Sequence, residues 1–305
     1  MKIKKNYDKN FKILSCDGGG LKGIMFLVFL AELENKLQKK CYEIFDLVIG
    51  TSTGGITAAL IASGKSAKEI LTIYIKNAKN IFKKRFLWIV NPLTYIRGSR
   101  YNRKFLDNLA IKELNISMKD LKCQLIVTGV NMRDARSTHF FKSYKEKYKN
   151  IPTYAPVMAT YSAPTYFGYF KDKKNLLQTE NKKGGVFSDG GVGIQTCTLL
   201  KSYIETKLQN KSDDYWILSC GCGYTNLNDY SDFLFSQIGD FLPIAREQSI
   251  TEQINECKEL NVNFNRIDIK IDKEYNDMDK PKNIMHYINY GKQLIHKYLN
   301  NLIEG

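Results

Sequence analysis

A serine lies between two glycines in the segment FDLVIGTSTGGITAALIASG, residues 45–64. The stretch Gly50-Thr51-Ser52-Thr53-Gly54 matches the pattern G-x-S-x-G, with an apolar run before it and a small-residue, helix-forming run after it. A serine on such a strand-to-helix turn has a strained backbone that projects its Oγ from the sheet, and the helix N-terminus favours developing negative charge. The pattern predicts Ser52 as a nucleophile, with Gly50 and Gly54 making room for the turn. A glycine-rich turn without chemistry is the alternative.

A nucleophilic serine needs donors for the oxyanion that forms when it attacks a carbonyl. The segment FKILSCDGGGLKG supplies Gly18, Gly19 and Gly20 between an expected strand and an expected helix. Glycine amides approach an oxyanion without obstruction by a Cβ, and the helix N-terminus adds its dipole. The same glycines, with Gly23, also match the G-x-G-x-x-G pattern of a phosphate-binding turn, although no acidic strand end follows at the usual distance.

A second phosphate-binding pattern lies in residues 59–66, which fit a relaxed Walker A motif with alanine in the first position. A P-loop must follow a strand and begin a helix. Here the stretch lies at the end of the helix that Ser52 is expected to begin. Gly64 is therefore expected to end that helix, and Lys65 to complement its dipole.

The base is the next requirement, and the chain has only three histidines, His139, His286 and His296. None has the loop context of a catalytic histidine, and we interpret all three as structural or solvent-facing. Asp189 follows an apolar run in GGVFSDGGVG and is followed by two glycines. A partly desolvated carboxylate at the same sheet edge as Ser52 would act as a base, whereas an ordinary Asp-Gly turn is the alternative.

Strand-like and helix-like runs alternate along the chain, which predicts one α/β domain with a mostly parallel sheet and helices on both faces. The expected strands are residues 12–16, 45–49, 124–130, 186–188 and 216–219, with a late edge strand at 266–271. The expected helices are residues 24–37, 55–62, 67–80, 102–109 and 283–304.

The amino-acid composition limits which partners and which cellular compartment we expect for the protein. The 46 basic and 31 acidic residues give a net charge of +15, which attracts polyanions such as nucleic acid, acidic lipid or phosphorylated metabolites. The basic N-terminus lacks an apolar signal region, no apolar run is long enough to span a bilayer, and seven cysteines show no metal-type spacing. We expect a cytoplasmic protein without metal or cofactor.

Four motifs in order, DGGGLKG, GTSTGG, SAPTYF and DGG, resemble those of the patatin-like phospholipase family. The resemblance covers residues 11–225 and implies a three-layer patatin-like α/β sandwich, with residues 230–305 as a less family-typical extension of a single domain. It implies a Ser52–Asp189 dyad, an oxyanion hole from Gly18, Gly19 and Gly20, and phospholipase A chemistry. Lys22 would face a lipid phosphate. Relatives often have asparagines and a proline after Asp-Gly-Gly, whereas this chain has VGIQT.

Residues 80–101 interleave aromatic and basic side chains, which suits a bilayer interface with anionic headgroups. We therefore expect peripheral membrane contact with a phospholipid substrate; a helix packed on the core with solvated charges is the alternative. Because the family includes bacterial antiphage effectors, the resemblance extends to a membrane-degrading effector switched by a nucleotide or by homo-oligomerisation. A nucleotide- or nucleic-acid-binding module is the competing function, but it would not need Ser52 or Asp189. No stable nucleic-acid partner is expected.

Overall fold

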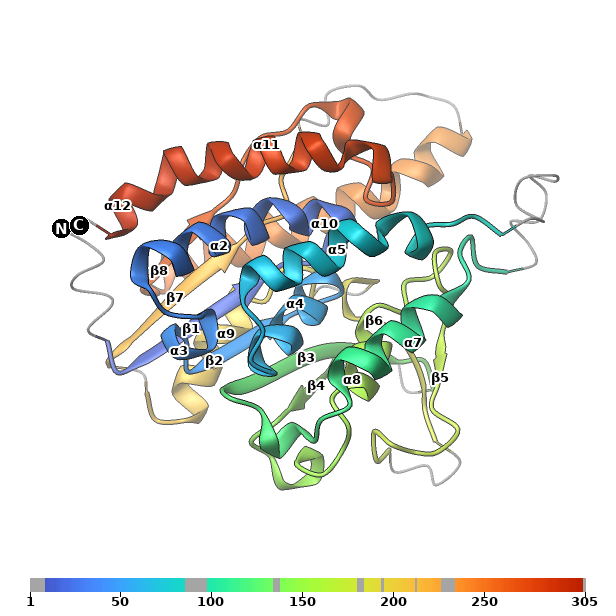
Figure 1. The fold of residues 1–305 in the computed structure, drawn as a ribbon, viewed down its shortest axis with the longest axis horizontal. Coiled ribbons are helices and arrows are strands. Elements are labelled where there is room, and N and C mark those ends of the chain that lie inside the picture. The colour runs from blue at the N-terminus through green and yellow to red at the C-terminus, as the bar shows by residue number, and fades with distance from the viewer. Residues whose placement is uncertain are drawn as a thin grey trace.

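The computed structural model describes residues 9–85, 98–133, 138–179, 184–192, 195–211, 213–225 and 234–303. Within these ranges, eight strands form one sheet in the order β5-β6-β3-β2-β1-β7-β8, with β4 beside β3 (Figure 1). The strands are β1 (Phe11–Cys16), β2 (Leu47–Gly50), β3 (Gln124–Asn131), β4 (Thr138–Lys142), β5 (Phe170–Lys171), β6 (Val186–Asp189), β7 (Tyr215–Cys220) and β8 (Phe264–Ile267).

The centre of the sheet is parallel, as the buried apolar runs predicted. Strand β1 pairs in parallel with β2 and β7, and β3 and β8 extend the parallel part on either side. Strands β4 and β6 pair antiparallel with β3. Leu14 and Val48 face the larger hydrophobic core, whereas Ile13 and Ile49 face the smaller one, so both faces of the central strands are buried.

Helices cover both faces of the sheet. The larger core lies under α2 (Ile24–Leu37), α3 (Cys41–Ile44), α4 (Thr53–Ala62), α5 (Ala67–Ile81), α7 (Arg103–Leu114), α8 (Tyr154–Thr160) and α11 (Ile284–Leu294). A π-helical turn (Ile295–Leu299) and α12 (Asn300–Ile303) continue from α11. The smaller core lies under α9 (Leu199–Leu208) and α10 (Leu234–Glu259). The predicted α/β sandwich with a mostly parallel central sheet is confirmed.

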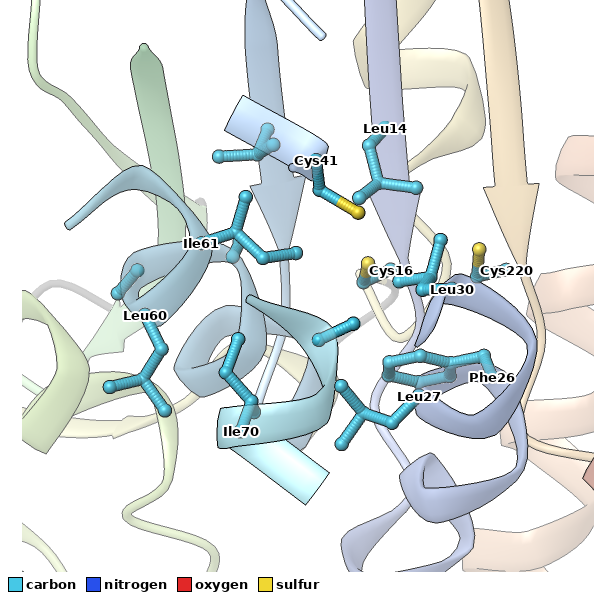
Figure 2. Close-up of a cluster of buried hydrophobic side chains, with 14 of the residues drawn as sticks. Leu14, Cys16, Phe26, Leu27, Leu30, Cys41, Leu60, Ile61, Ile70 and Cys220 are labelled. Atoms are coloured by element: carbon cyan, nitrogen blue, oxygen red, sulfur yellow. The ribbon is translucent and has the colours of Figure 1, made fainter. Parts of the chain in front are cut away.

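The larger core joins elements from distant parts of the chain. Figure 2 shows Leu14 and Cys16 of β1 and Cys220 of β7 on the same side of the sheet as Phe26, Leu27 and Leu30 of α2. Ile61 of α4 and Ile70 of α5 belong to the same buried cluster. Helix α5 begins with a capping box, in which Ser66 and Glu69 exchange hydrogen bonds with each other's main-chain N–H groups. This local signal and the apolar stripe together explain why the helix begins at Ala67.

The C-terminal segment is built into the same sheet. Strand β8 pairs with β7, and α11 lies along α2 in Figure 1. The two helices approach so closely at Gly291 that a Cβ there would lie 2.6 Å from Cβ of Val28. The edge strand expected at 266–271 is found at Phe264–Ile267, and α10 was not predicted.

Candidate active site

Several segments that the sequence analysis singled out meet at one edge of the sheet. Cys16 at the end of β1 lies opposite both Gly50 of β2 and Cys220 of β7. The glycine-rich loop and the serine turn therefore leave the sheet at the same level. Strand β6 ends nearby, with Asp189 paired to Gly129 of β3. The parallel register of β1, β2 and β7 and the antiparallel pairing of β6 with β3 thus place the glycine loop, the serine and the aspartate together.

Ser52 occupies the tight turn that the sequence pattern predicted. Its φ of 54° and ψ of −122° are unusual for a residue with a side chain, and it lies at the N-cap of α4. Gly54 permits the turn, since a Cβ at that position would lie 2.1 Å from the carbonyl oxygen of Cys16. The Ser52 main-chain N–H donates a 2.8 Å hydrogen bond to Oγ1 of Thr160. A serine held in this way matches the geometry of a nucleophile elbow.

Asp189 is the carboxylate next to Ser52. It is only 4% exposed, accepts a 2.8 Å hydrogen bond from the Gly191 N–H, and lies close enough to the Ser52 hydroxyl for hydrogen bonding from that group to lower its pKa. Burial raises the pKa of Asp189 to about 6, and these two hydrogen bonds and the charge of Arg246 oppose the rise. The carboxylate is therefore ionised near neutral pH but is a stronger base than an exposed aspartate.

The glycine-rich loop passes directly beside the serine. A Cβ at Gly18 would lie 3.3 Å from Cβ of Ser52, and Gly20 adopts a positive φ of 58°. The Gly18 N–H donates to the Thr196 carbonyl at 3.0 Å, whereas the Leu21 N–H donates to the Met278 carbonyl at 2.8 Å. In the described part of the chain, the N–H groups of Gly19 and Gly20 have no protein acceptor. The expectation that Gly18 also offers its amide is corrected, because that amide is already bonded.

Lys22 does not face the substrate side. Its side chain is fully buried, and Nζ donates to Oδ1 of Asn276 at 2.8 Å. Burial, followed by the charge of Arg246, lowers the pKa of Lys22 to about 7. The expectation that Lys22 contacts a lipid phosphate is therefore wrong for this structure. The position after the glycines turns inward because the short helical turn Gly20–Gly23 is packed beneath the C-terminal segment.

A buried ion network supports the base of the glycine loop. Asp17, which precedes Gly18, accepts a 2.6 Å hydrogen bond from Arg266 of β8, and Arg266 also binds Asp268 at 2.7 Å. Asp268 in turn accepts the Gly223 N–H at 2.9 Å. Burial raises the pKa of Asp17, and the guanidinium of Arg266 opposes that rise. This network connects the loop after β1 to the loop after β7.

The other candidate sites have structural explanations. Gly64 and Lys65 close the end of α4, because their N–H groups donate to the carbonyls of Ile61 and Leu60. The Walker A interpretation was therefore rightly set aside. His139 lies in β4 against the ring of Phe187, and the rings of His286 and Tyr275 stack with centroids 3.9 Å apart.

Of the aromatic and basic stretch 80–101, residues 86–97 lie outside the described residues, and these include Phe86, Trp88, Tyr95 and Arg97. Phe82 packs on the ring of Tyr101, with centroids 5.3 Å apart, and belongs to the protein core. Lys83, Lys84 and Arg85 are exposed and line an open groove of about 600 Å³, together with Asn80, Asn102, Lys104, Phe105 and Asn108.

Two residues of the site had no sequence signal. Thr160 lies two positions before the SAPTYF motif, and its role depends on β3 and α8 bringing it to the serine turn. Arg246 lies in α10, outside every motif, and its Nη2 donates to the Gly18 carbonyl at 2.9 Å. Within the described ranges, no cluster of histidine, cysteine or carboxylate residues is suited to a metal ion, and no helix has the length and apolarity needed to cross a membrane.

Comparison with known proteins agrees with this geometry. The family model described as patatin-like phospholipase matches residues 14–196. Patatin-like protein 2 of Oryza sativa subsp. indica is 28% identical over 260 residues, covering 73% of this chain and 63% of that protein. The cGAMP-activated phospholipase of Escherichia coli (strain TW11681) is 29% identical over 242 residues, covering 72% of this chain and 63% of that protein.

Similar solved structures include VipD from Legionella pneumophila, at 12% identity and a TM-score of 0.47 over 96% of this chain and 67% of that one. The matched part of the chain spans about three fifths of the curated relatives' length. Because the family model covers more than half of the chain, including the glycine loop, the serine turn and Asp189, the chain belongs to the patatin-like phospholipase family.

Proposed function

We propose that the protein is a serine acyl hydrolase that cleaves fatty-acyl esters of membrane phospholipids, as a phospholipase A. The proximity of the Ser52 hydroxyl to the buried Asp189 carboxylate, whose pKa that hydroxyl lowers, is the observation that carries this proposal. It couples a serine on a strained turn to a buried carboxylate, which is the arrangement needed to activate an alcohol. In the described part of the chain, the nearby glycine loop also has two amides, of Gly19 and Gly20, without a protein acceptor.

In the proposed reaction, Asp189 takes the proton of Ser52 as Oγ attacks the ester carbonyl. The amides of Gly19 and Gly20 stabilise the tetrahedral oxyanion, and Gly18 leaves space for the substrate beside Ser52. Asp189 then gives its proton to the departing lysolipid alcohol. Water attacks the acyl-serine with Asp189 again as base, the fatty acid leaves, and the proton returns to Ser52. No other reactant is required.

A phospholipid substrate is supported by the family and by the charged surface near the site. The basic groove lies beside the start of α7, where Arg100 donates to Asp279 at 2.8 Å. Asp279 follows Met278, whose carbonyl accepts the Leu21 N–H of the glycine loop. A surface rich in lysine near the site suits peripheral contact with anionic lipid headgroups. We therefore propose a protein of the cytoplasm that associates with membranes during catalysis.

Regulation is a further part of the proposal. Relatives from Escherichia coli and Vibrio cholerae bear the name cGAMP-activated phospholipase, and the latter is 31% identical over 173 residues. On this basis we propose a nucleotide activator or homo-oligomerisation as the switch of a membrane-degrading effector of antiphage type. Phospholipase activity with and without added cGAMP tests the nucleotide, and light scattering of the same samples tests assembly.

The substrate proposal is tested by fatty-acid release from vesicles of mixed phosphatidylethanolamine and phosphatidylglycerol, with wild type, Asp189→Asn and Asp120→Asn. Asp120 is exposed and far along the chain from every site residue, so its variant controls for loss of one carboxylate. We expect release by wild type and Asp120→Asn, and loss of at least about 100-fold with Asp189→Asn, within the usual range for a general base. Equal release by all three proteins would contradict the proposed base.

A further inference from the structure

Arg246 brings a positive charge to the glycine loop from the opposite end of the sequence. It lies in α10, and its Nη2 donates to the Gly18 carbonyl at 2.9 Å. A Cβ built at Gly19 would lie 3.5 Å from the same nitrogen. A Cβ built at Gly18 would lie 3.3 Å from Cβ of Ser52, so the residue that Arg246 bonds is next to the proposed nucleophile.

The guanidinium has few partners for its five N–H groups. Among the described residues, Nη1 reaches only the sulfur of Met278, at 3.7 Å, which is a weak acceptor, and Nε is buried without a hydrogen bond. Among the residues that the structure describes, no carboxylate forms an ion pair with Arg246. Glu247 and Asp189 are close enough to respond to its charge, but neither lies within ion-pair distance.

A half-buried arginine without a contact anion is unfavourable unless an anion binds in the working complex. Guanidinium groups bind phosphate through paired, charge-assisted hydrogen bonds. Lys22 is not available for this role, because its ammonium is buried on Asn276. The position of Arg246 beside the loop is therefore suited to the phosphodiester of a lipid whose ester lies at Ser52.

We propose that Arg246 binds the phosphate of the substrate lipid and so selects phospholipids over neutral glycerolipids at the Ser52 site. This inference rests on the proposed acyl-hydrolase function. It assigns to α10 the phosphate-binding role that the sequence placed on the glycine loop. Arg246 would be a substrate-binding residue, while its bond to the Gly18 carbonyl would keep the guanidinium in place.

The first test compares hydrolysis of phosphatidylcholine and of diacylglycerol with the same acyl chains, both in Triton X-100 micelles. Arg246→Gln should lower kcat/KM for phosphatidylcholine by about 10- to 150-fold, the range expected for hydrogen bonds to a charged group. Diacylglycerol hydrolysis should fall by a clearly smaller factor, because that reaction loses the bond to the Gly18 carbonyl and the charge near Asp189 but no phosphate contact. Arg246→Lys should have a kcat/KM for phosphatidylcholine between those of wild type and Arg246→Gln, since lysine keeps the positive charge but cannot form the paired hydrogen bonds of a guanidinium. Lys258→Gln removes one charge from the exposed end of the same helix and is the control.

Equal losses for the two lipids would overturn the proposal, because they would show that Arg246 only positions the loop. A second measurement does not depend on hydrolysis: binding of a dialkyl-ether phosphatidylcholine, which lacks a cleavable ester, to Ser52→Ala protein. Adding Arg246→Gln should weaken this binding by about 10-fold or more. Unchanged binding would also overturn the proposal. If wild type binds the ether lipid through Arg246 but hydrolyses neither phosphatidylcholine nor diacylglycerol, the proposed hydrolase function is wrong. The phosphate-binding site is supported by that same result.

Discussion

The main-chain N–H of Ser52 donates a 2.8 Å hydrogen bond to the side-chain oxygen of Thr160. This bond joins the strained turn after β2 to the end of α8. The acceptor is shielded from solvent, since Thr160 is fully buried, whereas Ser52 is partly exposed. The hydroxyl therefore holds the backbone of the proposed nucleophile in its unusual conformation, although Thr160 does not itself touch the reacting atoms.

Replacing Thr160 with valine keeps the shape of the side chain and removes the acceptor. We expect Thr160→Val to lose about 1–3 kcal/mol of unfolding free energy, the cost of leaving a buried donor unpaired. Its kcat should fall for every ester while KM changes little, because the nucleophile is displaced and no substrate contact is lost. Urea denaturation and steady-state kinetics measure the two effects. Thr160→Ser keeps the hydroxyl and should restore both; a serine variant as impaired as the valine one would contradict the role of the hydrogen bond.

The pKa of Asp189 predicts the acid limb of the pH–rate profile. Because burial raises this pKa to about 6, the base is protonated below that pH and ionised above it. Activity on a soluble ester such as p-nitrophenyl butyrate should therefore rise about tenfold per pH unit below pH 6 and level off above it. A profile flat from pH 4.5 to pH 7 would exclude Asp189 as the essential base.

The same carboxylate should weaken the fold at neutral pH. The folded protein holds the proton on Asp189 between the ordinary pKa of 3.8 and about 6, whereas the unfolded chain has lost it. Stability from this group is therefore full below pH 3.8 and is lost as pH rises through 6. Relative to Asp189→Asn, wild type should lose up to about 3 kcal/mol of unfolding free energy between pH 4 and pH 7.

Urea denaturation of both proteins at several pH values measures this difference. Asp120→Asn, at an exposed carboxylate, should show no comparable pH dependence. A constant difference between wild type and Asp189→Asn across the range would mean that the pKa of Asp189 is ordinary.

Lys22 predicts a pH dependence of the opposite sign. Its pKa is lowered from 10.5 to about 7, so the folded protein holds the neutral amine where the unfolded chain is charged. Stability from this group is full above pH 10.5 and is lost as pH falls through 7. Relative to Lys22→Met, wild type should gain up to about 3 kcal/mol between pH 7 and pH 9. Parallel stability curves for the two proteins would show that the ammonium is solvated, as the sequence suggested.

The sequence predicted best those elements whose local residue pattern agrees with the segments on either side of them. The apolar runs predicted the parallel centre of the sheet, because strands buried on both faces read as continuous hydrophobic segments. The bounds of α2 were predicted to the residue and those of α5 to within one residue, whereas the capping box of α5 was not predicted. The serine turn and Asp189 lie at one sheet edge, as predicted from the apolar strand before each of them, although β6, which carries Asp189, is antiparallel to β3.

Tertiary packing determined what the sequence could not show. Lys22 is a polar residue at a helix start, and only the C-terminal segment that covers it explains its burial on Asn276. The Gly18 amide is used by Thr196, a contact between residues far apart in the chain. Helix α10 contains Gly239 and Pro243, which disfavour a helix prediction, so Arg246 had no predicted element to place it.

The central claim is that Ser52 is an activated nucleophile, and covalent labelling tests it most directly. A fluorophosphonate probe should react with folded wild type and with Ser63→Ala, a serine at the far end of the same helix, but not with Ser52→Ala. Mass spectrometry should place the adduct on the peptide that contains Ser52. Equal labelling of wild type and Ser52→Ala, or no labelling of folded wild type with or without added cGAMP, would contradict the serine acyl-hydrolase mechanism.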